Sequence, residues 1–234
     1  MSSWVWIAIA ITLVCWGNVA YVYGGYLLVL KGLSYFCRKE SSLDQQINAQ
    51  SLPQLTVLLT VHNEAGKVSK RLKNILNQSY PQKRLDILVA SDGSDDGTDE
   101  EVRKWIEPSK PVHLVTFPRL GKSAAQNQAM DYVRGDIVIF TDADTRFDTQ
   151  FLDQITRPFV DTSVGCVTGV VRWDGGDSAV ETGLGLYWTY EMLLRALESR
   201  LGILVVASGQ AMAVRREYFR ELPSEVGEDC MIPL

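Results

Sequence analysis

Two acidic residues, Asp142 and Asp144, have a spacing that suits metal binding. They are separated by one residue and follow an apolar run at residues 137–140. In extended backbone, alternate side chains leave on the same face, so both carboxylates can reach one cation. Mg²⁺ and Mn²⁺ prefer oxygen ligands and keep positions that substrate phosphates fill. The pair therefore predicts a Mg²⁺ or Mn²⁺ site that neutralises a diphosphate leaving group, although acids with this spacing are also common in solvated loops.

A glycine-rich acidic loop occupies residues 91–97. Its sequence first resembles a calcium loop, but the twelfth position is Arg103 instead of glutamate and a strand precedes it, so the EF-hand interpretation fails. A short glycine-rich loop between a strand and a helix can present backbone N–H groups to a nucleotide or phosphate. The alternative is an ordinary turn in which Asp95 or Asp96 caps the next helix.

Two other positions carry side chains that catalysis could use. Near the end of the sequence, Asp229 follows Glu228, and a carboxylate there could take the proton from an attacking hydroxyl as general base. The structural alternative is a helix N-cap. Lys122, after Gly121, could offset phosphate charge at the donor, or it could be a surface lysine.

Apolar runs and helical stripes alternate along the chain and predict the elements that position these residues. Strands are predicted at residues 55–61, 86–90, 112–117 and 136–140, and helices at 66–78, 98–106 and 123–133. Such alternation predicts βαβ units and an α/β fold with a mostly parallel sheet. The second half is less regular, with strands predicted at 164–172, 203–207 and 211–215 and a long helix at 179–201.

Three polar loops, at residues 62–64, 91–97 and 142–144, each follow a predicted strand. Ligands of parallel sheets bind at the carboxyl ends of the strands, so we expect these loops to meet at one edge. Surface loops are polar in general, so their placement supports a ligand site without establishing one.

Composition excludes several classes of protein. At 234 residues with 46% hydrophobic residues, the chain can form one α/β domain and an extra apolar segment, but not two full domains. A net charge of -5 argues against nucleic acid as a partner. The four cysteines show no zinc-site spacing, which indicates reduced thiols in a cytosolic protein.

The first thirty residues lack any charged side chain, which predicts a transmembrane helix at residues 4–30. Lys31, Arg38 and Lys39 follow, so we expect a cytoplasmic catalytic domain attached to the inner (plasma) membrane. A cleaved signal peptide is the alternative, but the basic start and small-residue cleavage site are missing. A polar linker at residues 31–53 and a catalytic domain at 54–234 complete the predicted organisation.

The motifs form an ordered series that resembles the family 2 inverting glycosyltransferases. The resemblance covers nearly all of the chain from Leu55 to Leu234. Its motifs are residues 60–64 (Thr-Val-His-Asn-Glu), 91–98 (Ser-Asp-Gly-Ser-Asp-Asp-Gly-Thr), 121–122 (Gly-Lys), 141–144 (Thr-Asp-Ala-Asp), 208–210 (Ser-Gly-Gln) with 215–217 (Arg-Arg-Glu), and 227–229 (Gly-Glu-Asp).

This resemblance implies a nucleotide-sugar-binding fold of the GT-A type. It places Glu64 and Asp92 around the nucleoside, Asp142 and Asp144 at the metal and diphosphate, and Asp229 as the catalytic base. The implied reaction is one in-line displacement at the anomeric carbon with inversion.

The resemblance also implies the partners. The expected donor is a nucleotide-diphosphate sugar, with a UDP-sugar as the family-level expectation, and the expected acceptor is a glycan or lipid in cell-surface polysaccharide or glycolipid synthesis. Polysaccharide-making members continue into a Gln-x-x-Arg-Trp helix that this sequence lacks, so we expect a C-terminally incomplete chain of uncertain activity.

Two other interpretations stay open. The first is a membrane-tethered donor-binding fragment or pseudoenzyme. The second is a nucleotidyltransferase, which usually has a glycine-rich loop with Arg and Lys near the first strand; residues 62–67 do not supply one.

Overall fold

The computed structural model describes residues 3–36, 52–172, 179–204 and 206–223. The chain divides into two compact units, one of residues 1–40 and 172–204 and the other of residues 41–171 and 205–234. The sequence did not separate residues 172–204 from the catalytic domain, and the predicted domain boundaries stay predictions.

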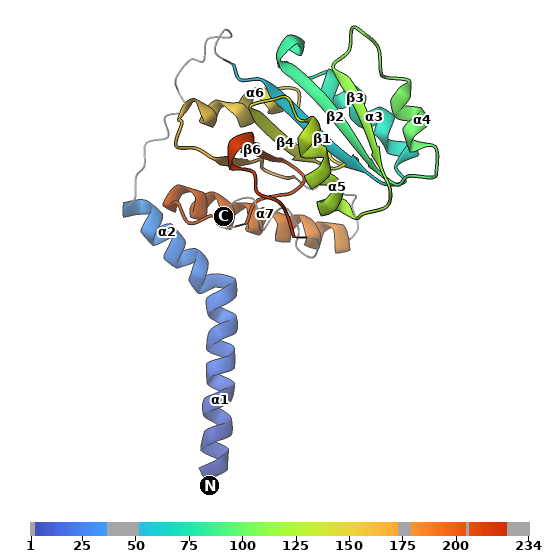
Figure 1. Cartoon of the computed structure of the whole chain (residues 1–234). Helices are drawn as coiled ribbons and strands as arrows, with labels where there is room; N and C mark the ends of the chain where they lie inside the picture. The colour runs from blue at the N-terminus through green and yellow to red at the C-terminus, as the bar shows by residue number, and fades with distance from the viewer. Residues whose placement is uncertain (1–2, 37–51, 173–178, 205, 224–234) are drawn as a thin grey trace. The chain divides into compact units, whose positions relative to one another are not determined.

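The larger unit is built on a six-stranded sheet with the order β3-β2-β1-β4-β6-β5 (Figure 1). The four strands from β3 to β4 are parallel, whereas β6 runs antiparallel to both β4 and β5. Their bounds are Leu55–Val61 (β1), Leu85–Asp92 (β2), Val112–Phe117 (β3), Ile137–Thr141 (β4), Cys166–Thr168 (β5) and Met212–Arg215 (β6). The α/β fold with a mostly parallel sheet is thereby confirmed.

Alternation along the strands creates two apolar layers because successive side chains leave on opposite faces. On β1, Val57 and Leu59 belong to the core beneath α3, α4 and α6, whereas Leu58 belongs to the core beneath α5. The helices are Ala65–Leu76 (α3), Thr98–Arg103 (α4), Lys122–Ala129 (α5) and Phe151–Thr156 (α6). Short 3-10 turns lie at Gln82–Arg84, Met130–Tyr132, Arg157–Val160 and Arg216–Tyr218. The sheet, covered on both faces, supplies a rigid base for its edge loops.

One prediction about the second half was wrong, and one helix was missed. The described residues of 203–207 form no strand. β6 already pairs with β4 on one side and β5 on the other, and the described residues of this segment pair with neither edge strand, β3 or β5. Helix α6 was not predicted, because its six residues are too few for a periodic pattern to be recognised.

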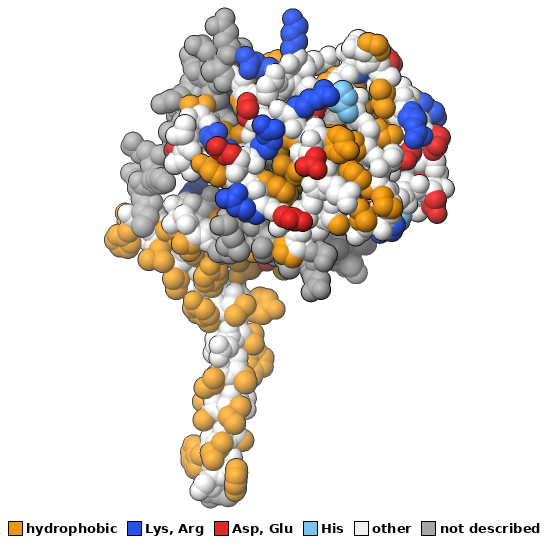
Figure 2. Space-filling view, viewed as in Figure 1, with side chains coloured by type: hydrophobic (Ala, Val, Ile, Leu, Met, Phe, Trp, Pro, Cys, Tyr) orange, Lys and Arg blue, Asp and Glu red, His pale blue; other side chains and the backbone are white. Residues whose placement is uncertain are grey.

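The smaller unit contains the apolar N-terminal helix. It runs through α1 (Ser3–Ala20), a π-helical stretch (Tyr21–Gly25) and α2 (Tyr26–Phe36). Within the described residues, Ser3–Phe36 is the one helix long and apolar enough to cross a membrane. No residue of α1 is buried, and apolar side chains cover it in Figure 2.

Helix α7 (Ala179–Leu201), predicted from the sequence, belongs to the same unit. The hydroxyl of Tyr26 donates to Glu198 Oε1 at 2.7 Å. The hydroxyl of Tyr190 lies 3.2 Å from Val22 O and 3.3 Å from Tyr23 O. These contacts attach α7 to the N-terminal helix.

Candidate active site

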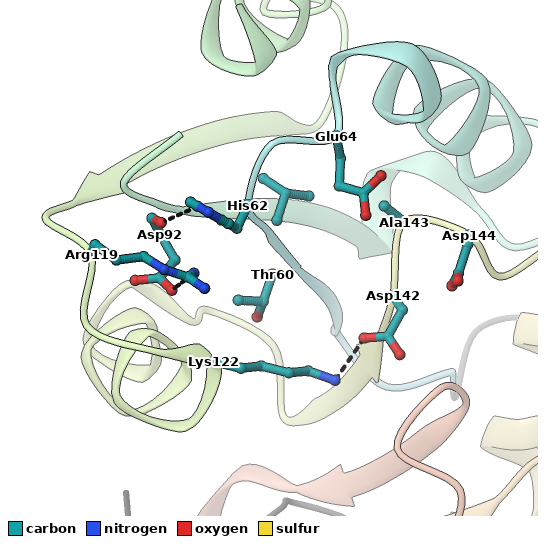
Figure 3. Close-up of a pocket in the computed structure, with 10 residues that line it drawn as sticks. Thr60, His62, Glu64, Asp92, Arg119, Lys122, Asp142, Ala143 and Asp144 are labelled. Atoms are coloured by element: carbon teal, nitrogen blue, oxygen red, sulfur yellow. Dashed lines mark hydrogen bonds and ion pairs between the residues drawn. The ribbon is translucent and has the colours of Figure 1, made fainter. Parts of the chain in front are cut away.

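A cavity of about 280 Å³ opens at the carboxyl ends of β1, β2 and β4. The expected convergence of polar loops is therefore present, and all five described candidate residues reach this cavity (Figure 3). Its wall consists of Thr60, Val61, His62, Glu64, Asp92, Arg119, Lys122, Asp142, Ala143 and Asp144.

Asp92, the last residue of β2, is 1% exposed, and its carboxylate is fully engaged. Arg119 donates a charge-assisted hydrogen bond to Oδ2, and the backbone N–H of Leu120 donates to Oδ1 at 2.7 Å. The N–H of Gly121 lies 3.2 Å from Oδ1 and 3.1 Å from Oδ2. Asp92 thus fixes the segment that leads to Lys122, a role that sequence spacing did not indicate.

The loop after β4 presents Asp142 and Asp144 at the cavity. Ala143, between them, is buried, so the loop turns its apolar side inward and its two acids outward. Lys122, the first residue of α5, places Nζ 2.7 Å from Asp142 Oδ1. The structure thus brings Lys122 to the acidic pair, and its expected role of offsetting phosphate charge stays a prediction.

Glu64 lies where β1 passes into α3, and its Oε2 is 3.0 Å from Lys67 Nζ. Its backbone N–H donates to Thr98 Oγ1 at 2.8 Å. The carboxylate of Asp96 bridges the same junction, accepting from Ala65 N at 3.1 Å and from Thr98 N at 3.0 Å. Asp96 thus accepts the first N–H of both α3 and α4, whereas the N-cap residue of α4 is Gly97 and not the expected Asp95 or Asp96. The glycine-rich loop is therefore tied directly to the start of α3.

The arrangement fits a divalent cation bound together with a phosphate. Within the described part of the chain, no group of three or more His, Cys, Asp or Glu side chains could hold a metal ion by itself. Mg²⁺ typically takes one or two protein carboxylates and completes its shell with substrate phosphates and water. Asp142 and Asp144 supply that number, and the cavity beside them has room for the phosphates.

The wall also contains residues that the sequence does not single out as site residues. Thr60 Oγ1 is buried and has no hydrogen-bond partner among the described residues. His62 Nδ1 lies 2.8 Å from Asp92 O. Both belong to a motif already noted, so a signal existed for them. Arg119 had no signal, because only folding brings it to Asp92. Asp229, the predicted base, lies outside the described residues.

A mostly parallel sheet with polar loops gathered at the carboxyl ends of its strands is the arrangement in which open α/β proteins bind their ligands. Residues 56–223 match glycosyl transferase family 2. The chain belongs to this family, and its fold is of the GT-A type.

The chain is similar to curated glycosyltransferases. It is 31% identical over 133 residues to glycosyltransferase AglE of Haloferax volcanii, covering 55% of this chain and 44% of that protein. It is 28% identical over 162 residues to a beta-monoglucosyldiacylglycerol synthase of Nostoc, covering 68% of this chain and 34% of that protein. The chain thus spans less than half the length of these relatives.

Among solved structures, the chain is similar to the mannosyltransferase PcManGT of Pyrobaculum calidifontis in complex with GDP-Man and Mn²⁺. The TM-score is 0.71 at 26% identity, and the match covers 91% of this chain and 59% of that one.

Proposed function

We propose that this protein transfers a sugar from a nucleotide-diphosphate sugar, with UDP as the first candidate nucleotide, to a glycan or lipid acceptor with inversion at the anomeric carbon. The observation that carries the proposal is the single cavity shared by Asp142, Asp144, Lys122 and Asp92. Two carboxylates, a lysine and a fixed loop together suit a diphosphate that arrives with a divalent cation.

In this proposal, Asp142 and Asp144 hold Mg²⁺ or Mn²⁺ at the donor's diphosphate. The bound cation would stabilise the negative charge that develops on the leaving group. When the donor binds, the Lys122 ammonium group would leave Asp142 and bind a phosphate oxygen instead. Its 2.7 Å ion pair with Asp142 already places it at the end of the cavity where the diphosphate would lie. The charge on the loop is then shared between the cation and the lysine.

The nucleoside would lie between Glu64 and Asp92. Support comes from the hydrogen bonds of Asp92, which fix the Arg119–Gly121 backbone along the cavity wall. Thr60 Oγ1, buried at the same wall, has no hydrogen-bond partner among the described residues, which leaves a donor and an acceptor unused there. The base and ribose of a nucleotide both need such groups.

The acceptor end is proposed from the family. Asp229 would accept the proton of the attacking hydroxyl while the donor's anomeric carbon is inverted. Residues 4–30 would span the plasma membrane and keep the catalytic domain on the cytoplasmic side, where nucleotide sugars are made. Relatives named for glycolipid and polysaccharide synthesis support an acceptor at the cell surface.

A second candidate is a membrane-tethered module that binds the nucleotide sugar without transferring it. It is favoured by one observation, that the residues proposed for the donor all line a cavity formed by residues 60–144. Donor binding alone would require no contribution from Asp229.

The test combines calorimetry and turnover on the full chain with UDP-glucose, UDP-N-acetylglucosamine and GDP-mannose, each with Mn²⁺ or EDTA. Transfer that needs metal and is lost in Asp144→Asn supports the enzyme, whereas metal-dependent binding without transfer supports the second candidate. The matched control is Asp148→Asn, an exposed acid four positions further on that does not line the cavity. Absence of binding for every donor would contradict both.

A further inference from the structure

Asp142 and Asp144 lie on a loop whose two ends are both bound by side chains of helix α3. The loop leaves β4 at Thr141 and reaches buried Phe147 before α6 begins. On α3, Arg71 is hydrogen-bonded to Thr141, and Asn74 is hydrogen-bonded to Phe147. Arg71 and Asn74 are three apart in a helix and therefore share one face.

Asn74 binds the far end of the loop through its whole amide group. Its Oδ1 accepts the backbone N–H of Phe147 at 2.8 Å, and its Nδ2 donates to the carbonyl of the same residue at 2.9 Å. Oδ1 also accepts from Arg71 Nη1 at 2.7 Å. An amide that satisfies both backbone groups of one residue fixes the position and direction of the chain there.

Arg71 binds the near end of the loop from inside the protein. It is 2% exposed, and its Nη2 donates to Thr141 Oγ1 at 2.6 Å. The Thr141 hydroxyl in turn donates to Gln210 O at 2.8 Å. The guanidinium also lies over the Phe147 ring, 3.9 Å from its centroid, so one side chain contacts both ends of the loop.

A buried arginine is costly unless charges or hydrogen bonds compensate it. Burial lowers the pKa of Arg71 to about 9, while the negative charges of Asp142 and Asp144 act in the opposite direction. At neutral pH the guanidinium therefore carries its positive charge, and the negative charges of the two acids at the candidate metal site favour this charged form. No carboxylate forms a direct ion pair with Arg71 among the described residues.

We propose that Arg71 and Asn74 are positioning residues for the metal and diphosphate site: they hold the Thr141–Phe147 loop so that Asp142 and Asp144 face one cation. This inference rests on the proposed function of those two acids. Neither residue touches the donor; each acts through backbone and hydroxyl groups of the loop. Outer residues of this kind typically change metal affinity about 10–100-fold when replaced.

The test uses Arg71→Lys and Asn74→Ala in the full chain. Lysine keeps the positive charge but cannot bridge Thr141, Asn74 and the Phe147 ring with one planar group. We expect each variant to weaken binding of UDP in the presence of Mn²⁺ by about tenfold or more. Binding of uridine in EDTA, which does not use the loop acids, should stay within twofold. Calorimetry measures the UDP and uridine affinities, and the free Mn²⁺ signal in electron paramagnetic resonance measures the metal.

Arg215→Lys is the matched control. Arg215 also stacks on an aromatic ring, Phe159, and binds the backbone carbonyl of Val164 at 2.8 Å, but it does not line the cavity. The Arg215→Lys substitution should lower the melting temperature, but it should not weaken UDP binding in Mn²⁺ more than uridine binding in EDTA. Equal losses of both affinities in Arg71→Lys, or no loss in either, would overturn the positioning role. If the unmodified chain binds UDP equally well with Mn²⁺ and EDTA, the proposed metal function fails instead.

Discussion

Lys122 Nζ lies 2.7 Å from Asp142 Oδ1, and this ion pair joins the start of α5 to the loop after β4. Both side chains are partly exposed, at 41% and 28%, so the pair contributes about 1 kcal/mol or less to stability. The pair matters for binding more than for stability, because it holds the Lys122 ammonium group at the wall where a diphosphate is proposed to bind.

Replacing Lys122 by Met should therefore affect binding much more than stability. We expect UDP affinity in Mn²⁺ to fall about tenfold or more, because one hydrogen bond to a charged group contributes about 1.5–3 kcal/mol and a factor of ten corresponds to about 1.4 kcal/mol. The urea midpoint should be unchanged. Lys104→Met, which removes an exposed lysine paired with Glu101 on α4, is the control and should change neither quantity. Unaltered UDP affinity in the Lys122 variant would remove this lysine from the site.

Asp92→Asn should destabilise the larger unit. The substitution removes the negative charge that Arg119 binds and turns one acceptor oxygen into a donor that faces the N–H of Gly121 or Leu120. We expect a loss of about 1–3 kcal/mol in the free energy of unfolding, measured by urea denaturation. Asp95→Asn, in the exposed part of the same loop, should cost less than about 0.5 kcal/mol. Equal stability of the two variants would contradict an anchoring role for Asp92.

Local patterns anticipated those parts of the site that lie on one continuous segment. Asp142 and Asp144 could be paired from their spacing, and the strand ends indicated which loops would meet. Arg71, Arg119 and Asn74 could not be found in this way, because their partners lie between 27 and 73 positions away in the sequence. A buried arginine within an amphipathic helix gives no signal until the loop beneath it is known.

For the fold too, features set by one continuous segment could be predicted, whereas features that depend on distant segments could not. β1 and β3 match their predicted bounds because the sequence marks their ends, β1 with the polar residues Gln54 and His62 and β3 with Pro111 and Pro118. Residues 203–207 were predicted as a strand from composition, yet β-structure also needs a hydrogen-bonded neighbour, and the described residues of this segment have none. Pairing between distant segments, which no local pattern encodes, decided that case.

Gly93 and Gly97 provide a matched pair for testing the contact between the glycine-rich loop and Arg119. Both have positive φ, 64° and 91°, so alanine strains the backbone at either position. A Cβ at Gly93 would lie 2.7 Å from Arg119 N, whereas a Cβ at Gly97 would meet nothing within 4 Å. We expect Gly93→Ala to be roughly 1–3 kcal/mol more destabilising than Gly97→Ala.

Only the Gly93 variant should also weaken binding of UDP, because it displaces the segment that forms the cavity wall. Urea denaturation and calorimetry measure the two effects. The same loss of stability in both variants would show that strain alone matters and that the close approach to Arg119 does not.

Cys166 on β5 should be chemically inert in the folded protein. Burial raises the pKa of its thiol to about 11. At pH 8 the reactive thiolate is then roughly a hundredfold scarcer than for an ordinary cysteine of pKa about 8.5–9. Alkylation by iodoacetamide, followed in a variant with Cys15, Cys37 and Cys230 replaced by Ser, should be correspondingly slow and should rise about tenfold per pH unit between pH 8 and 10. A rate that levels off near pH 9 would contradict the raised pKa.

Asp142 and Asp144 are proposed to bind the donor's diphosphate through a divalent cation. The most direct test of this proposal is the affinity of the full chain for UDP, measured by calorimetry as Mn²⁺ is titrated, in the unmodified protein and in Asp144→Asn. We predict that Mn²⁺ raises UDP affinity at least about tenfold in the unmodified protein and that Asp144→Asn abolishes the increase. UDP binding of equal strength in EDTA and in Mn²⁺, or an undiminished metal effect in Asp144→Asn, would contradict the account.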